Sequence, residues 1–291
     1  MVSRKRFSSG DEQLELFSIV PNSSDIRSKQ VRDLMTWGVF NISNRRKQGI
    51  RHEQGSLFVE ISTTGEKGIA TYHDNDILIF LTSHLVQALN NGDKLGRRIF
   101  FTANEFFKFS GREHSSGARY DLIWDSLTRL QDTFIHTNIK IGGDKEIEER
   151  WNWLPKIKRI KSSQTGKSIG FEVDVAEAIY RSINQSTPQV LTLDRRYFEF
   201  RSGFNKWLYL YARKSAGKEG NEWVATERLL HSLSGSSSNL NDFRSMLKAV
   251  VDSGELADYQ LRHAYIGKDK AVAFVRKRHL PIYTHKSTLI L

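Results

Sequence analysis

The sequence predicts the same run of elements twice: a short helix, a turn and a longer helix, followed by a β-hairpin. In the first copy the short helix covers 102–109 and the longer helix covers 116–131. In the second copy the short helix covers 225–232, a Gly-Ser turn follows at 235–238, and the longer helix covers 239–252. A helix held in this way fits the major groove of DNA, and a following hairpin can lie along the phosphate backbone.

Strands predicted after each helix pair complete the two units. The first pair is followed by strands at 134–141, 151–160 and 168–174, and the second by strands near 258–266 and 271–276. A further helix is predicted before each pair, at 77–89 and at 204–215, and the order helix, helix, helix, hairpin is that of a winged helix. We therefore predict an α+β fold with two tandem winged-helix domains, each a helix-turn-helix plus a β-hairpin wing. The two copies match in layout and not in residue identity, so the expected duplication is one of architecture.

The remaining segments set the expected boundaries. Upstream of the first unit, the sequence predicts a hairpin of 57–62 with 68–72 and an amphipathic helix from Ile77 to Leu89. A closing helix is expected at 176–183, and the polar segment 184–188 is the best domain boundary. We expect a flexible polar tail at 1–30, an N-terminal winged-helix domain at 31–185, a C-terminal winged-helix domain at 188–280 and a C-terminal tail at 281–291.

The charge of the chain favours a polyanionic partner. Among 291 residues, 44 Lys and Arg stand against 33 Asp and Glu, which gives a net charge of +11. Such a balance favours nucleic acid as a ligand and fast, electrostatically steered association. No apolar run is long enough to span a membrane, and the N-terminus lacks the pattern of an export signal, so we expect a cytoplasmic protein.

The longer helices carry the candidate base-reading residues. Their apolar residues recur at helical spacing, which leaves polar side chains on the opposite face and at the helix start. Recognition helices present such residues to base edges, and arginine can bind guanine through two hydrogen bonds. For either helix the alternative is an ordinary amphipathic helix with a solvated polar face. The candidates are Arg112, Ser115, Ser116 and Arg119 in the first copy and Asn241, Arg244 and Lys248 in the second.

Candidate phosphate-binding residues lie in the first predicted wing and in the second turn. The stretch 156–167 contains no acidic residue, and strand alternation places its cations along one edge of the hairpin. A soluble edge strand protected by lysines is the alternative. Serines before the second helix can donate to phosphates beside the backbone amides of a helix N-terminus. The candidates are Lys156, Lys158, Arg159, Lys161, Lys167, Ser236, Ser237 and Ser238.

We expect no catalytic residue, metal ion or cofactor, and therefore no enzyme. Gly166-Lys-Ser168 resembles part of a phosphate loop, but Lys161 stands where its leading glycine is required, which excludes an ATPase. Capping and dipole effects explain Asp74 and Asp76, because both lie at a predicted helix start. The nine histidines are scattered, so the paired ligands of a strand-nicking nuclease are missing.

Several segments resemble the plasmid replication initiator protein A family of bacteria. The resemblance spans about residues 31–266 and depends on the order and spacing of its segments together. Tyr72-His73 and Phe80 depart from the aromatic residues usual in the family, and Ala257-Asp258 stands where Pro-Gly is typical. The segments that carry the resemblance are 32–35 leading into 40–46, 68–79, 120–131 with Trp151-Asn-Trp153, 206–214, and Ser234-Gly-Ser before Asn239.

The resemblance implies a tandem winged-helix initiator that binds repeated double-stranded DNA sites at a plasmid origin. It also implies monomers at the origin, a homodimer on the protein's own promoter, and recruitment of the host helicase and DnaA. Binding would bend the origin and stress an adjacent A·T-rich segment. Some members of the family are described as binding single-stranded DNA, which a basic aromatic surface permits.

Three other functions remain open alternatives at this point. A dimeric transcriptional autorepressor would use the same DNA-binding chemistry. A nicking initiator nuclease would need a nucleophilic tyrosine as well as metal ligands. A basic scaffold protein would bind no DNA sequence specifically.

Overall fold

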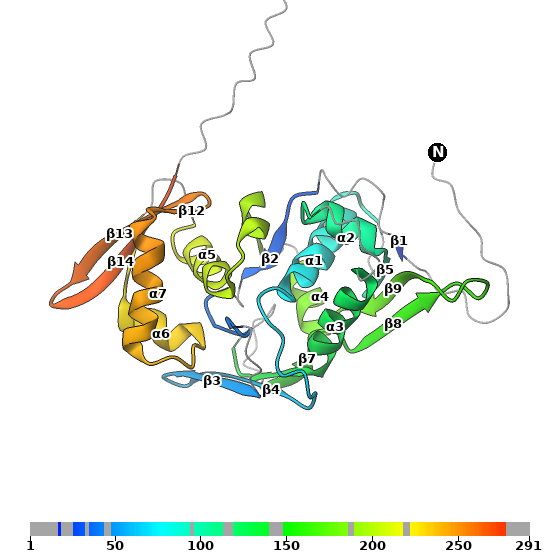
Figure 1. The fold of residues 1–291 in the computed structure, drawn as a ribbon, viewed down its shortest axis with the longest axis horizontal. Helices are drawn as coiled ribbons and strands as arrows, with labels where there is room; N and C mark the ends of the chain where they lie inside the picture. The colour runs from blue at the N-terminus through cyan, green and yellow to red at the C-terminus, as the bar shows by residue number, and fades with distance from the viewer. Residues whose placement is uncertain are drawn as a thin grey trace, which may run out of the picture.

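The computed structural model describes residues 26–32, 35–43, 48–93, 96–112, 119–139, 148–185, 189–217 and 222–277, and the backbone of 17–18. The fold is mixed α+β, as predicted. It contains two copies of one topology at opposite ends of an elongated molecule, with β2 between them (Figure 1). None of the helices in these ranges is both long and apolar enough to cross a membrane.

The first copy, here called the first module, confirms the predicted helix order. Strand β5 pairs with β9, and β9 pairs with β8, so the strand before the helix pair borders the second strand of the hairpin. The two-residue strand β1(Phe17–Ser18) adds to the free side of β5 in parallel orientation. The module consists of α1(Asn75–Asn90), β5(Arg98–Phe101), α2(Ala103–Phe109), α3(Arg119–Asp132), β8(Lys156–Lys161) and β9(Ser168–Asp174).

The second copy, here called the second module, has the same order and the same pairing. Strand β11 pairs with β14, and β14 pairs with β13. A short strand, β12(Glu255–Leu256), extends this sheet beyond β13. The module consists of α5(Gly203–Ser215), β11(Glu222–Thr226), α6(Glu227–Ser234), α7(Leu240–Asp252), β13(Tyr259–Ile266) and β14(Asp269–Arg276).

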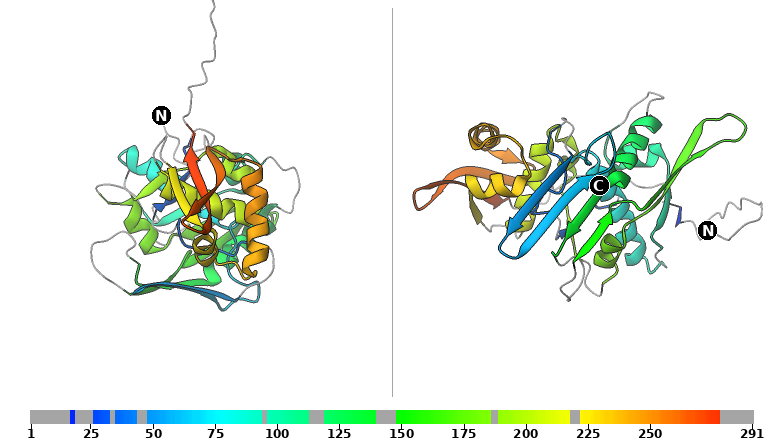
Figure 2. Two further views of the ribbon diagram at one scale, coloured as in Figure 1. Left: turned by 90° about the vertical axis from the view of Figure 1, so that its left-hand side faces the viewer. Right: turned by 90° about the horizontal axis from the view of Figure 1, so that it is seen from below.

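A separate four-stranded sheet lies across one side of the molecule, and here two strand predictions are wrong (Figure 2, right). The hairpin expected between 57–62 and 68–72 does not form, because β4 pairs instead with the strand before it, across a turn at Gly55. Residues 151–152 end a strand of this sheet and do not continue into the hairpin of the first module. The sheet has the order β3(Gly49–Gln54), β4(Leu57–Thr63), β6(Thr133–Thr137), β7(Glu149–Asn152).

Short elements join the modules. Strand β2(Lys29–Val31) pairs with β10(Val190–Thr192), so the fold already includes residues 29–30 of the expected tail. These two strands lie on opposite sides of the boundary predicted at 184–188. Helix α4(Glu177–Ile183) and the 3-10 helix η3(Arg195–Glu199) flank the same boundary.

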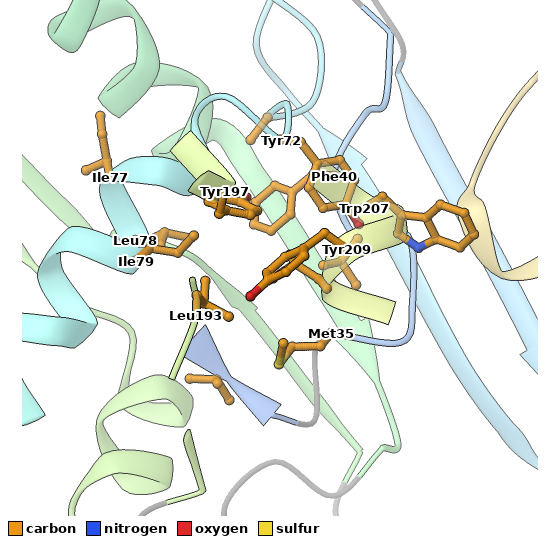
Figure 3. Packing of buried hydrophobic residues seen from close by; sticks show 14 of the residues in the cluster. Met35, Phe40, Tyr72, Ile77, Leu78, Ile79, Leu193, Tyr197, Trp207 and Tyr209 are labelled. Carbon is orange, nitrogen blue, oxygen red and sulfur yellow. The ribbon is translucent and has the colours of Figure 1, made fainter. Parts of the chain in front are cut away.

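Buried apolar side chains of both modules form one contiguous core. At its centre, Tyr197 of η3 and Tyr209 of α5 lie beside Phe40 and Tyr72 (Figure 3). All four rings are buried, and Phe40 makes an edge contact with Tyr72 at a centroid distance of 5.4 Å. The core therefore fixes α5 against α1, because side chains of both helices are part of it.

Candidate nucleic-acid interface

Helix α7 and the hairpin β13–β14 enclose a groove of about 240 Å³ at the end of the second module. The groove is lined by four basic side chains, by one aromatic ring that is 68% exposed and by the acidic Glu227. Two predicted base-reading residues line it, from helix positions one turn apart. The basic and aromatic residues of the groove are Arg244, Lys248, His263, Tyr265 and Lys270.

Three of these basic side chains contact acidic residues of the same module. The Nε of Arg244 donates to Oε2 of Glu227 at 2.7 Å. The ammonium of Lys248 and the Nε2 of His263 both contact the carboxylate of Asp252, and these contacts lower the pKa of that carboxyl. Lys270 is exposed and has no such partner within the described part of the chain.

The start of α7 is organised by its own side chains. Asn239 caps the helix and accepts from the backbone amides of Asn241 and Asp242. The hydroxyls of Ser236 and Ser238 lie 2.7 Å apart, and Ser238 donates from its backbone to Ser236. Ser237 and Asn241 are exposed. Of the predicted residues at this helix start, these two therefore have the most accessible side chains.

The structure does not favour the predicted base-reading role of Arg112, because its guanidinium is bonded inside the protein. It pairs with Asp76, which is fully buried, and lies 3.5 Å from the carbonyl oxygen of Phe198. Lys206 of α5 binds the same carboxylate at 2.9 Å. Burial lowers the pKa of Lys206, and Asp76 acts in the opposite direction. Arg112 thus ties the end of α2 to α1 and to η3.

For Asp74 and Asp76 the predicted place at a helix start is confirmed, since Asp74 is the N-cap residue of α1 and Asp76 lies in its first turn, but the predicted capping hydrogen bond is wrong. The Asp74 carboxylate makes no helix-capping hydrogen bond and instead receives two hydrogen bonds from Arg129, at 2.6 and 2.8 Å. Both aspartates are buried acceptors for arginines that the sequence places in or next to the first helix pair. Charge alone did not reveal this, since the partners are 36 and 55 positions away.

The structure gives little support to the other base-reading candidates of the first helix pair. Ser115 and Ser116 lie outside the described residues. Arg119 is half-buried, lies over the ring of Phe107 at 5.5 Å, and its Nε is buried without an acceptor. The start of α3 therefore packs against its own module.

The hairpin β8–β9 carries its cations in two groups. Lys158 pairs with Glu172 at 2.8 Å, and Arg159 pairs with Asp121 of α3 at 2.7 Å. Lys156, Lys161 and Lys167 are exposed. The exposed group keeps the predicted capacity to contact phosphates, whereas Lys158 and Arg159 are partly neutralised by acidic neighbours.

A sequence repeat that was missed explains why the two helix pairs fold alike. In each pair a threonine, Thr102 or Thr226, caps the start of the short helix. The dipeptide Ser-Gly stands at the end of the same short helix, at 110–111 and at 234–235. Each of these glycines has a positive φ, 68° and 66°. The common pattern of a threonine with Ser-Gly eight residues later was visible in the sequence, but only three of ten positions are identical.

The residues of β13–β14 that line the groove were also missed. The sequence did not indicate His263, Tyr265 and Lys270, because the pattern of a strand does not show which neighbouring helix the strand will face. No group of three or more acidic or histidine side chains suited to a metal ion occurs among the residues that the structure describes.

Comparison with known proteins identifies the family. A protein of Wigglesworthia glossinidia brevipalpis described as a "Putative replication protein" is 29% identical over 214 residues, which cover 73% of this chain and 76% of that protein. Two crystal structures of domains 2 and 3 of RctB share the fold, with TM-scores of 0.58 and 0.54 at 12% and 14% identity. These alignments cover 85% of this chain and 98% and 97% of the RctB chains. The family described as "Replication initiator protein A" matches residues 29–261, and the chain belongs to that family.

Proposed function

We propose that this replication initiator binds repeated double-stranded DNA sites through two winged-helix modules, with the second module as the principal reader of bases. The groove between α7 and β13–β14 carries this proposal. It combines basic side chains on a helix with a hairpin that continues the same basic surface. A helix in the major groove and a hairpin beside the backbone would use both parts.

The first module contributes mainly phosphate contacts in this proposal. Three of its exposed lysines, Lys156, Lys161 and Lys167, lie on the β8–β9 hairpin, which projects at the opposite end of the molecule from β13–β14 (Figure 1). Two hairpins so far apart are suited to one long DNA footprint. Phosphate contacts of this kind add affinity without sequence information and make binding sensitive to salt.

Initiation would then be mechanical and would require no covalent chemistry by this chain. Binding at several repeats would bend the origin, stress an adjacent A·T-rich segment and provide a platform for the host helicase and DnaA. Bending one site costs about 1–6 kcal/mol, which phosphate contacts can offset. A homodimer on the promoter of the gene would account for autoregulation.

The test is selection of bound fragments from the replicon that carries this gene, at physiological salt with excess competitor DNA. We expect a cluster of repeats beside an A·T-rich stretch. A single operator upstream of the gene would instead favour a repressor, and uniform recovery that disappears as salt rises would contradict specific binding.

A second assay tests the absence of strand cleavage. Supercoiled plasmid carrying the selected repeats is incubated with the protein and a divalent metal ion. We expect no nicked and no protein-linked DNA. Either product would replace the mechanical proposal with a nuclease.

A further inference from the structure

The contact between Glu227 and Arg244 joins the two helices of the second helix pair. Glu227 is the first residue of α6 and its side chain is 12% exposed, whereas Arg244, in the second turn of α7, is 36% exposed. The Nε of Arg244 donates to Oε2 of Glu227 at 2.7 Å. The acid is thus the buried partner, and the arginine extends from it towards solvent.

This contact uses only one of the donor groups of the guanidinium. Arginine presents five N–H donors in a planar fork. Among the described residues, the guanidinium of Arg244 donates its side-chain hydrogen bond to Glu227, and it does so through Nε. The edge formed by Nη1 and Nη2 stays available in the groove that Arg244 lines. That edge is the one that can bind O6 and N7 of a guanine together.

The first module shows that the fold does not need this ion pair. Aligning the buried residues Ile123 with Phe243 and Leu127 with Leu247 places Trp124 at the position of Arg244. Aligning the capping residues Thr102 and Thr226 places Ala103 at the position of Glu227. Trp124 stacks on Phe171 of β9 at a centroid distance of 6.5 Å, so the position of Arg244 is occupied in the first module by a ring packed against the sheet.

The ion pair between Lys248 and Asp252 within α7 differs from this one. Lys248 and Asp252 are 67% and 47% exposed and lie one turn apart on the same helix. An exposed pair of that kind restricts its side chains little, because water competes for both charges. Glu227, in contrast, is largely enclosed and can hold the guanidinium in one orientation.

We propose that Glu227 is a positioning residue that orients Arg244 to read a guanine and at the same time disfavours phosphates at the groove. Its carboxylate fixes the guanidinium before DNA arrives, so less conformational entropy is lost on binding a base edge. Its negative charge repels a backbone phosphate that competes for the same arginine. Glu227 would therefore increase the discrimination between sites more than it increases affinity. This inference rests on the proposed DNA binding by the second module.

The experiment measures the affinity of the full chain for its selected repeat and for a scrambled duplex of equal length. The variants are Glu227→Ala, Glu227→Gln, Arg244→Ala and the double variant Glu227→Ala with Arg244→Ala. Glu222→Ala is the matched control. It also removes one negative charge from the second module, but the native Glu222 pairs with Arg262 and not with Arg244. Thermal unfolding of each variant identifies any that fails to fold.

Arg244→Ala is expected to weaken binding to the repeat about 5- to 150-fold, the range for loss of one bidentate base contact. Glu227→Ala is expected to lower the ratio of repeat to scrambled affinity about tenfold, mostly by loss at the repeat, with scrambled binding unchanged or tighter. In the Arg244→Ala background the Glu227 change should have no further effect on that ratio, since the positioned group is gone. Glu227→Gln keeps an acceptor and should retain part of the discrimination, and Glu222→Ala should retain all of it.

Two results would overturn the inference, and they differ in what else they affect. If the native chain discriminates between the duplexes but the Glu227 and Arg244 changes are additive, the positioning role is wrong and the DNA-binding proposal stands. If the native chain binds both duplexes equally, the proposed function fails and this inference fails with it.

Discussion

The Nζ of Lys206 lies 2.9 Å from Oδ1 of Asp76, and neither side chain has any exposed surface. Asp76 belongs to the first turn of α1 in the first module, and Lys206 belongs to α5 of the second. Lys206 also lies over the ring of Tyr197 at 4.2 Å. A buried charge requires a partner, so this contact fixes the two modules against each other.

Removal of Asp76 is expected to cost more stability than removal of Lys206. Asp76→Asn leaves both Lys206 and Arg112 without a counter-charge, and uncompensated buried charge typically costs about 3–5 kcal/mol. Lys206→Met still leaves Arg112 to neutralise Asp76, so a smaller loss is expected. Urea unfolding of the two variants compares their free energies directly. Equal losses would mean that Arg112 does not share the carboxylate.

Arg112 and Arg244 are expected to behave differently although both were predicted to read bases. Arg112→Met should lower the free energy of unfolding and leave the ratio of specific to non-specific affinity nearly unchanged, because the guanidinium is bonded inside the protein. Arg244→Ala should instead cost about 1–3 kcal/mol of binding at the true site. A selective loss of discrimination in Arg112→Met would restore its predicted role.

Lys161 and Lys167 are expected to act as phosphate contacts. Both are exposed on the hairpin of the first module and neither belongs to an ion pair within the described ranges. Replacing either by alanine should weaken binding to all sequences similarly and reduce the slope of log affinity against log salt by about one. Lys158→Ala is the comparison, since Glu172 already neutralises that lysine, and its effect on the slope should be smaller.

His84 is expected to make the protein less stable as the pH falls from 7 to 5. Burial among Phe80 and Phe109 lowers the pKa of His84 to about 4, against a backbone hydrogen bond to Phe80 that acts in the other direction. Between pH 6.5 and 4 the unfolded chain therefore binds a proton that the folded chain does not, and stability decreases as the pH is lowered through this window. The expected loss from this group at pH 5 is about 2 kcal/mol. The free energy of unfolding should therefore decrease between pH 7 and pH 5 by that amount less in His84→Leu than in the native chain. The same decrease in both proteins would contradict the low pKa.

Gly38 is expected to tolerate no side chain. A Cβ at this position would lie 2.2 Å from the carbonyl oxygen of Ser234, the last residue of α6. The amide of Gly38 donates to Leu233 at 2.7 Å, so the segment cannot move away without losing this bond. Gly38→Ala should cost at least the 1–3 kcal/mol typical of overpacking. Gly55→Ala, at a positive φ but with open space around it, is the comparison and should cost about 1–2 kcal/mol.

Much of the local structure could be predicted because it depends on near neighbours in the chain. The apolar spacing of Ile77 to Leu89 predicted α1 almost to its ends, and the Gly-Ser turn before Asn239 predicted where α7 begins. Strand partners were harder to predict. Residues 68–72 were expected to pair with 57–62, but β4 pairs with β3 and with β6, which lies seventy positions further along the chain.

The site was predicted in part for the same reason. Arg244 and Lys248 lie on one helix, where the spacing of apolar residues determines the opposite face, and both line the groove. Arg112 follows a helix too, but its environment depends on Asp76 and Lys206, which come from two other helices. Nothing in the spacing of charges indicates such a partner.

The sequence alone determined the family, the order of the helices, the excess of positive charge and the helix faces that stay polar, because these depend on composition and on periodicity over a few turns. Only the tertiary structure decided which basic side chains face solvent and which form ion pairs with buried carboxylates. The reason is physical: the free energy of a charge depends on its solvation and on the charges within a few ångströms of it. Residues as distant in sequence as 76 and 206 supply those neighbours only once the chain has folded.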